Sequence, residues 1–359
     1  MTRNPPATFT RRGLLAGAAA CAFAPDALAA DEPSLAALGR AIGVEVGCCW
    51  PASGMPGYLE LVDRHTDLAV HEWQLKPRFL KPAPDGPWRF AEADAIAAAA
   101  RARGKRLHGH TLFWHHEPIR WAESADFAQV QRLYGGFLRA VVSRYPDFVS
   151  WDVMNEIAEE GTVLRDDFLL SRHGYRFIDF CFRTVHEVAP SARLVLNDYN
   201  LECGKSFCDD KRANMLAILR RLKAMGTPVH AIGIQAHLSS RWPQSPKATA
   251  NFIAAVEDLG LEVYISELDV NDVDFADDIA TRDRQVADAY ETFLDAVLAR
   301  PAVRRLVFWG LSDAANWITT FEDGESRGVL ARPALFDRLD RPKPAFEAVC
   351  RALAAAPAR

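Results

Sequence analysis

Two glutamates end or interrupt short apolar stretches, in a pattern typical of paired catalytic carboxyls. The first, Glu156, closes the stretch Trp151–Glu156 (WDVMNE), and the second, Glu267, lies within Leu261–Asp269 (LEVYISELD). Strands of a parallel barrel are buried and apolar, and their carboxyl ends carry the polar side chains of the active site. The two stretches therefore predict two strands that each deliver one glutamate to a common cleft.

Such a pair suits the hydrolysis of a glycosidic bond. One carboxyl protonates the leaving oxygen, and the other either attacks the anomeric carbon at a separation of about 5 Å or activates a water at roughly 6.5–9.5 Å. Two neighbouring carboxyls do not both ionise easily, so one keeps its proton near neutral pH. Either glutamate alone would more often be a salt-bridged barrel carboxylate, but the two together favour sugar chemistry.

The elements needed to position these residues recur along the chain. Eight strand-like stretches alternate with amphipathic helical stretches, and they predict one α/β domain, a (β/α)8 TIM barrel with its active site at the C-terminal face of the strands. The longest irregular connection, residues 157–170, follows Glu156 and is expected to form a cleft wall. We expect strands at residues 44–47, 68–70, 106–114, 151–155, 193–197, 231–235, 261–267 and 304–309, and helices at 91–103, 126–144, 175–188, 210–225, 248–259, 282–299 and 345–353.

Composition excludes some partners and favours others. The 359 residues carry a net charge of -5, which gives no sign of a nucleic-acid partner. Aromatic residues make up 10% of the chain and include nine tryptophans. Aromatic faces serve as platforms for sugar rings, although any single tryptophan is as easily a core residue.

The N-terminal residues resemble an export signal. Arg11-Arg12 precedes a short Ala-rich apolar stretch, and Ala27–Ala29 has the small-residue pattern of a cleavage site. Residues 1–29 are therefore expected to form a twin-arginine-type signal peptide, and residues 30–359 the catalytic domain. The apolar stretch is too short to span a bilayer. We expect a periplasmic or secreted protein with no membrane association after cleavage, and a monomer.

Cysteine and histidine spacing gives little support for a metal. Of the six cysteines after residue 29, only Cys203 and Cys208 are close enough to close a small loop, which export would permit. A metalloenzyme interpretation rests on His110, His115 and His116, but no HExxH or comparable ligand spacing supports it. The sequence thus predicts neither a metal nor a cofactor.

Six short motifs, in order, resemble those of the glycoside hydrolase family 10 xylanases over about residues 40–350. The resemblance implies a retaining endo-β-1,4-xylanase that acts on xylan and xylo-oligosaccharides without a metal or cofactor. The matching motifs are residues 109–115 (GHTLFWH), 151–156 (WDVMNE), 197–200 (NDYN), 233–238 (GIQAHL), 266–269 (SELD) and 309–313 (WGLSD) with Trp317.

The same resemblance implies a role for each site residue. Glu156 would be the acid/base and Glu267 the nucleophile, and Asn155 would bind the 2-hydroxyl of the sugar at the cleavage point. His237 would hold Glu267, and Asp269 would fix the histidine. The other implied contacts are Gln235 beside His237; His110, Trp114 and Lys76 at the glycone sugar; Trp309 and Trp317 as walls; Tyr199 at the leaving-group side; and Glu72 from the second strand.

One departure from the family pattern bears on the substrate. Trp73 stands where the family has an asparagine that helps to bind the second glycone sugar, while Glu117 and Ile318 replace a common glutamine and arginine. An indole there can stack on a sugar or fill the subsite. Two alternatives therefore stay open. One is a retaining β-glycosidase of the same family that acts on decorated xylan or another β-glycan, and the other is a non-catalytic carbohydrate-binding barrel.

Overall fold

Strands and helices alternate along the chain in the computed structural model, which describes residues 33–50, 55–320 and 330–359. The expected signal peptide over residues 1–29 lies outside these ranges. The strands are β1 (Glu45–Trp50), β2 (Leu68–His71), β3 (Arg106–Gly109), β4 (Ser150–Asn155), β5 (Arg193–Asp198), β6 (Ala231–Ile234), β7 (His237–Ser239), β8 (Glu262–Asn271) and β9 (Val303–Phe308). The helices are α1 (Leu35–Ala41), α2 (Pro56–His65), α3 (Pro77–Leu80), α4 (Ala91–Ala102), α5 (Phe127–Arg144), α6 (Phe168–Val188), α7 (Ser206–Ala224), α8 (Pro246–Asp258), α9 (Ile279–Leu298) and α11 (Pro344–Ala355), with 3-10 turns η1 (Arg120–Ala122) and η2 (Ile318–Thr320).

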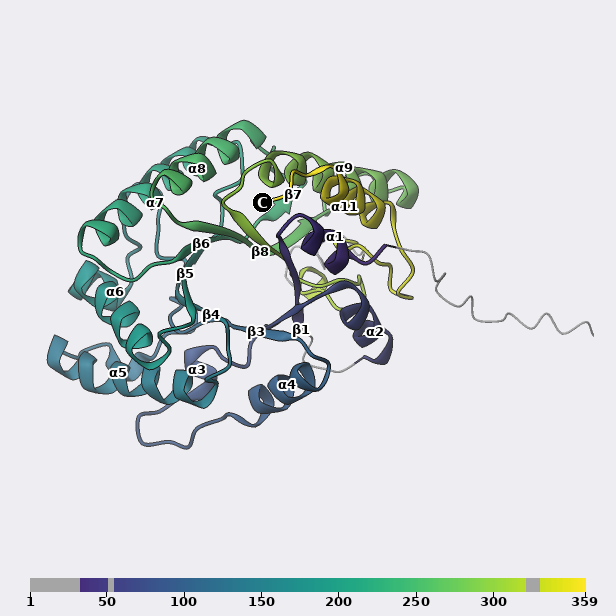
Figure 1. Ribbon diagram of the computed structural model, residues 1–359. Coiled ribbons are helices and arrows are strands. Elements are labelled where there is room, and N and C mark those ends of the chain that lie inside the picture. Colours follow the sequence, from purple (N-terminus) through teal and green to yellow (C-terminus); the bar gives the residue numbers. More distant parts are fainter. Residues whose placement is uncertain (1–32, 51–54, 321–329) are drawn as a thin grey trace, which may run out of the picture. The chain divides into compact units, whose positions relative to one another are not determined.

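Parallel pairing closes the strands into a barrel. The strands β1 to β6 pair in order, β6 pairs with β8, β8 with β9, and β9 returns to β1. Figure 1 looks along this barrel and shows the strands as an inner ring with the helices outside it. Among the described residues, β7 is the strand outside the ring, and it pairs with the end of β8 so that His237 faces Asp269. The predicted (β/α)8 TIM barrel is confirmed.

Alternating side chains of β4 show how one strand serves two environments. All of its residues are buried. Trp151 and Val153 belong to the hydrophobic core, where the Trp151 ring stacks on Phe148 with centroids 5.0 Å apart. Ser150 and Asp152 instead make polar contacts inside the barrel. Up to Val153, the period of two thus sends apolar residues to the helices and polar residues to the barrel interior, and a register shift between Asp152 and Met154 ends this alternation.

The barrel interior contains a continuous chain of polar contacts. Arg305 Nε donates to Glu45 at the start of β1 (2.8 Å), and Arg305 also donates to Ser150 (2.7 Å). The Ser150 hydroxyl contacts His108 Nδ1 at 2.7 Å, and His108 Nε2 lies 2.9 Å from Asp152. Buried polar groups need such partners, and these contacts lead along the barrel interior to Asp152 on β4.

Two elements differ most from their predicted bounds. The third strand was expected to reach Trp114, but β3 ends at Gly109, where the Trp151 ring lies 2.0 Å from the position that a Cβ would take. Helix α6 has a kink at the non-helical residue Gly174 (φ 53°), so the helix expected from Tyr175 is its second segment, and an unexpected first segment begins at Phe168. The connection after Glu156 is therefore shorter than expected.

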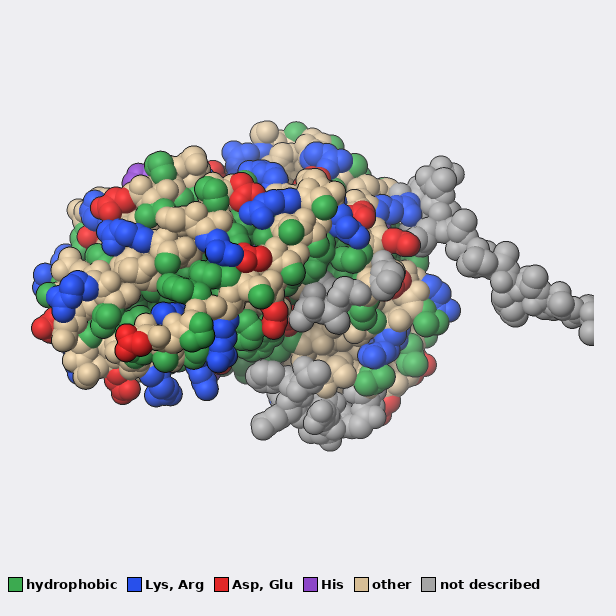
Figure 2. All heavy atoms as spheres, turned by 90° about the horizontal axis from the view of Figure 1, so that it is seen from below, with side chains coloured by type: hydrophobic (Ala, Val, Ile, Leu, Met, Phe, Trp, Pro, Cys, Tyr) green, Lys and Arg blue, Asp and Glu red, His purple; other side chains and the backbone are tan. Residues whose placement is uncertain are grey.

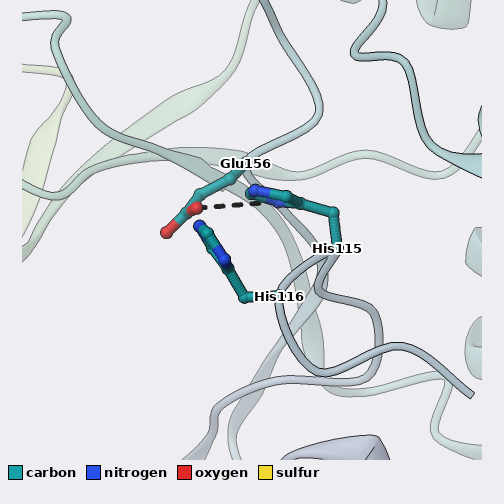
Figure 3. Close-up of side chains that lie close together, drawn as sticks. All are labelled: His115, His116 and Glu156. Atoms are coloured by element: carbon teal, nitrogen blue, oxygen red, sulfur yellow. Dashed lines mark ion pairs between the residues drawn. The ribbon is translucent and has the colours of Figure 1, made fainter.

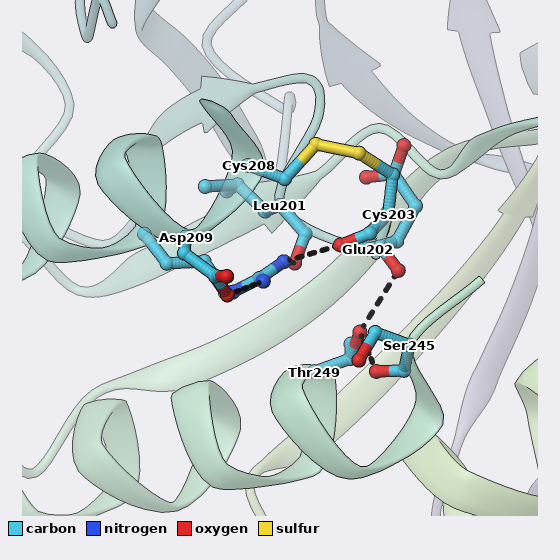
Figure 4. Close-up of a disulfide and its surroundings, with 8 residues drawn as sticks. Leu201, Glu202, Cys203, Cys208, Asp209, Ser245 and Thr249 are labelled. Atoms are coloured by element: carbon cyan, nitrogen blue, oxygen red, sulfur yellow. Dashed lines mark hydrogen bonds and ion pairs between the residues drawn. A yellow bond between two sulfur atoms is a disulfide. The ribbon is translucent and has the colours of Figure 1, made fainter. Parts of the chain in front are cut away.

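The sequence left the pairing of the cysteines open, with Cys203 and Cys208 as one possible pair, and the structure joins these two. The disulfide joins the connection after β5 to the first turns of α7, with Cα atoms 5.9 Å apart (Figure 4). Arg212 donates to the carbonyls of Leu201 and Cys203, and Thr249 donates to that of Glu202. The loop that follows β5 is thus tied to both α7 and α8.

The molecular surface carries charges of both signs. Figure 2 shows Lys and Arg side chains interspersed with Asp and Glu on the face in view. Among the described residues, no helix is both long and apolar enough to cross a membrane.

Candidate active site

Glu156 follows the last residue of β4 in a left-handed conformation, with φ 60°. This conformation is uncommon for residues other than glycine and is found where the surrounding structure enforces it. The Glu156 amide donates to the Asn197 carbonyl at 2.8 Å. Its Oε1 accepts hydrogen bonds from Gln235 Nε2 (3.0 Å) and Asn155 Nδ2 (3.2 Å). Only 8% of the residue is exposed, so the carboxyl is held in a defined position.

Glu267 is buried within β8 and is held from two sides. Asn197 Nδ2 donates to its Oε1 at 2.6 Å, and His237 Nε2 lies 3.3 Å from its Oε2. The other nitrogen of that histidine, Nδ1, lies 2.8 Å from Asp269 Oδ1. Trp317 donates to Asp269 Oδ2 at 2.6 Å. The aspartate thus fixes the imidazole, and the imidazole fixes Glu267.

The electrostatics of this cluster favour an ionised Glu267. Burial alone would raise the pKa of Glu267, but His110 and the hydrogen-bonded His237 outweigh it and lower the pKa below its usual 4.5. Burial opposes the charged form of His237, yet Asp269 and Glu267 raise the pKa of its imidazole well above 6.5. A carboxylate beside an imidazolium is the result.

The amide of Asn197 connects the surroundings of the two glutamates. Its Nδ2 donates both to Glu267 and to Asn155 Oδ1, at 2.6 and 2.9 Å. Its Oδ1 accepts from the Ser266 hydroxyl at 2.6 Å. Because Asn155 in turn donates to Glu156, both carboxyls belong to one hydrogen-bonded network that spans β4, β5, β6 and β8.

The floor of the site is formed by His110 and its partners. His110 Nδ1 lies 2.8 Å from Asp152 Oδ2 and 4.0 Å from Glu267 Oε1, and the ring packs edge-on against Trp309 with centroids 5.3 Å apart. Burial would raise the pKa of Asp152, but the contacts with His108 and His110 lower it. The polar chain through the barrel therefore reaches Glu267.

Lys76 lies between two indole rings at the side of the site. Its Nζ is 3.6 Å from the centroid of Trp73 and 4.1 Å from that of Trp114, whose rings lie 6.2 Å apart. Burial lowers the pKa of Lys76, against the attraction of Glu267 and Glu72. Trp73 is 45% exposed, whereas Lys76 is buried. The indole of Trp73 therefore covers the ammonium group from the solvent side.

Tyr199 is held on the opposite flank by cations. Arg165 donates to the Tyr199 hydroxyl and to the Glu156 carbonyl, both at 2.8 Å. Lys211 Nζ lies 3.3 Å from the centre of the tyrosine ring and 2.9 Å from Asp198 Oδ1. These contacts fix the start of the connection that follows Glu156.

His115 and His116 lie against the free oxygen of Glu156, and Figure 3 shows both rings turned toward this carboxyl. His115 Nδ1 is 3.7 Å from Glu156 Oε2, and the two imidazole centroids are 4.0 Å apart. Burial, with smaller contributions from Arg165 and His116, lowers the pKa of His115 to about 3. The His115 ring is therefore neutral at ordinary working pH.

The structure thus brings together most of the residues singled out from the sequence. One hydrogen-bonded network contains Glu156, Glu267, Asn155, Gln235, His237, Asp269 and Trp317. The rings of His110 and Trp309 border this network, and an adjoining cluster consists of Glu72, Lys76, Trp73 and Trp114. Arg165 connects Tyr199 to the backbone of Glu156. Sequence reasoning overlooked Asn197, Asp152 and Arg165. The signal for Asn197 was its place at the end of an apolar stretch within the NDYN motif.

Comparison with known proteins agrees with this geometry. The sequence profile of Glycosyl hydrolase family 10 matches residues 34–352. The chain is 30% identical to a beta-1,4-xylanase of Dictyoglomus thermophilum (80% of this chain, 82% of that one) and 31% identical to a thermostable celloxylanase of Thermoclostridium stercorarium (82% of each). It is also similar to the crystal structure of xylanase 10B from Thermotoga petrophila RKU-1 in complex with xylobiose, with a TM-score of 0.80, 26% identity and coverage of 90% and 97% of the two chains. The chain belongs to glycosyl hydrolase family 10.

Proposed function

We propose that this protein is a retaining endo-β-1,4-xylanase that hydrolyses internal bonds of xylan by double displacement, with Glu156 as acid/base and Glu267 as nucleophile. One observation carries the assignment of roles. The two carboxyls share a network but differ in their partners, because Glu267 lies beside the imidazolium of His237, whereas Glu156 is bound by neutral amides. The ionised Glu267 suits attack, and we assign proton delivery to Glu156.

The reaction follows from these partners. Glu267 attacks the anomeric carbon while Glu156 gives its proton to the leaving oxygen, which produces a glycosyl ester. The ester removes the negative charge of Glu267, so that Glu156 can then act as a base toward water. Asn155 is assigned to the 2-hydroxyl of the sugar, and His237 with Asp269 keeps Glu267 oriented between the two steps.

The substrate class is supported by the relatives. Those named above are described as xylanases or a celloxylanase, and one of the similar structures contains xylobiose. We assign Lys76, His110 and Trp114 to the glycone sugar, Trp309 and Trp317 to the walls of its pocket, and Tyr199 to the leaving-group side. Gln235 donates a hydrogen bond to Glu156, and the carboxylate of Glu72 attracts the ammonium group of Lys76.

A variant of this function is favoured by one observation, the indole of Trp73 over Lys76. Where the indole covers the second glycone subsite, the enzyme would prefer a decorated xylan or another β-glycan to plain xylan. A non-catalytic binding barrel fits less well, because binding alone needs neither the carboxyl pair nor the Asp269–His237 support of Glu267.

We further propose that the protein is exported by a twin-arginine-type signal over residues 1–29 and acts as a monomer in the periplasm or outside the cell. The paired arginines and the small-residue cleavage pattern support the export. The Cys203–Cys208 disulfide is compatible with an oxidising compartment.

Product analysis tests the activity. The purified protein is incubated with xylan, mixed-linkage glucan and cello-oligosaccharides, and the anomeric form of the first products is followed by NMR. Short xylo-oligosaccharides released first as the β-anomer are expected. If the protein hydrolyses only another β-glycan, the result would support the altered substrate preference attributed to Trp73. If it hydrolyses none of these glycans, the result would support a non-catalytic binding barrel.

A further inference from the structure

Three side chains around the free oxygen of Glu156 resemble the ligand set of a metal site. The potential ligand atoms of His115, His116 and Glu156 all lie within 4.8 Å of one another. The two histidines are neighbours in the loop that follows β3, and Glu156 comes from the end of β4, so the cluster forms only when these segments meet.

The hydrogen bonding leaves the relevant atoms available. Glu156 Oε1 accepts from Gln235 and Asn155, whereas Oε2 faces His115 Nδ1 at 3.7 Å, which is too long for a hydrogen bond. His115 Nδ1 is buried and has no hydrogen-bond partner. Buried polar atoms without a partner are rare in native proteins and call for an explanation such as an ion or a water.

We propose that His115, His116 and Glu156 Oε2 bind Zn²⁺, and that the bound cation inhibits the enzyme by withdrawing Glu156 from proton transfer. The inhibitory part rests on the acid/base role proposed above. The cation is a regulatory or adventitious inhibitor of a metal-independent reaction, not a catalytic metal.

The donor set selects the kind of cation. Two imidazoles and one carboxylate suit zinc and related transition metals, whereas Mg²⁺ and Ca²⁺ prefer oxygen ligands. Zinc takes such ligands at about 2.0–2.2 Å, so its ligand atoms lie about 3.3–3.5 Å apart. His116 is exposed and can close the remaining gap by rotation of its side chain, while the fourth position would hold a water.

The surrounding charges do not prevent a cation from binding. Arg165 lies nearby, but its guanidinium is paired with Glu159 at 2.6 Å. Lys211 is paired with Asp198 at 2.9 Å.

Calorimetric titration of the untagged full-length protein with ZnCl₂ tests the site directly. One saturable site is expected in wild type, with no equivalent heat for MgCl₂ or CaCl₂. Loss of even an outer partner of a metal ligand costs about 10- to 100-fold in affinity, so His116→Ala, which removes a direct ligand, should weaken binding by at least about 10-fold. His116→Gln serves as a second variant of the same position, and circular dichroism checks the fold of both.

His186→Ala provides the matched control. His186 also lies beside another histidine, His230, with ring centroids 5.9 Å apart, but it belongs to α6 and not to the cluster. This variant should bind zinc as wild type does. Wild-type affinity in both His116 variants, or no saturable binding in wild type, would overturn the proposal.

Activity supplies the second measurement. For each variant, xylan hydrolysis with Zn²⁺ is divided by its own rate in EDTA. This ratio should be well below one for wild type and for His186→Ala, and it should be close to one for the His116 variants. Zinc bound at this site without inhibition would refute the withdrawal of Glu156. A protein that hydrolyses no glycan would contradict the proposed function alone, because calorimetry would still decide the metal site.

Discussion

Asn197 Nδ2 lies 2.6 Å from Glu267 Oε1 and donates a hydrogen bond to it across the barrel. The same nitrogen donates to Asn155, so one amide on β5 aligns residues from β4 and β8. Asn197→Ala should lower kcat/KM on xylan by about 10- to 100-fold, because a hydrogen bond to a charged group contributes about 1.5–3 kcal/mol. Ser266→Ala, which loses the bond to Asn197 Oδ1, should show a smaller decrease. Full activity in Asn197→Ala at an unchanged Tm would contradict this role.

Removal of each carboxyl separates the two proposed roles. Glu267→Ala should abolish turnover of every substrate, since no glycosyl ester can form. Glu156→Ala should retain the first step on aryl glycosides with good leaving groups, because these need little protonation, and should lose xylan hydrolysis. Burst kinetics on an activated aryl xylobioside measure the difference. Equal losses in both variants on this substrate would argue against the assignment.

The acid limb of the pH profile should depend on His237. As the proposed nucleophile, Glu267 must be ionised to attack, so activity should fall as the pH drops through its pKa, which lies below 4.5 in wild type. His237→Asn removes a positive charge and raises this pKa, and the acid limb of kcat/KM should move to higher pH. His230→Asn, a substitution of a histidine outside the site, serves as the control. An acid limb at the wild-type position in His237→Asn would refute the coupling.

Glycone preference should respond to Trp73. Its ring covers Lys76 Nζ at 3.6 Å. Trp73→Asn uncovers the ammonium and opens the adjoining space, so the kcat/KM ratio of an aryl xylobioside to an aryl xyloside should rise by about 10-fold, within the range that a single contact contributes to specificity. Trp73→Phe keeps an aromatic ring and should change the ratio less. An unchanged ratio in Trp73→Asn would show that the indole does not limit the second subsite.

Gly233 on β6 tests how closely the network is packed. A Cβ on this residue would lie 2.1 Å from Asn197 Oδ1. Gly233→Ala should therefore lower the free energy of unfolding by about 1–3 kcal/mol and reduce activity as well. Gly136→Ala is the matched control, because its added Cβ meets nothing within 4 Å in α5, and it should stabilise by about 0.5–1 kcal/mol. Denaturant unfolding of both variants gives the comparison.

The barrel could be predicted because its strands are short apolar stretches that alternate with amphipathic helices, and this pattern can be seen in the sequence of each segment. Boundaries were less predictable. The apolar run from Arg106 to Trp114 indicated one long strand, but the chain leaves the sheet at Gly109 where the Trp151 ring takes the space. The helical segment over residues 168–173 was not expected, and the helix predicted from Tyr175 is the segment that follows the kink at Gly174.

Side chains that act across the barrel were the least predictable part of the site. Asn197 and Glu267 are 70 residues apart, and nothing local indicates that the amide reaches the carboxylate. Likewise, the spacing of His115 and His116 predicted no metal ligands, because their third partner, Glu156, comes from another strand. Motifs identified the chemical groups, whereas their pairing required the folded chain.

The length of β8 has a further consequence. Glu267 lies in the barrel wall and Asp269 in the projecting end that pairs with β7, two positions apart on a single strand. Side chains two positions apart point to the same face of a strand, so Glu267 and the aspartate that fixes its histidine both face the site. A register shift lies between Ile265 and Leu268, and insertion or deletion of one residue between Glu267 and Asp269 would turn one of the two side chains to the opposite face of the strand. The spacing of Glu267 and Asp269 along this strand is therefore constrained.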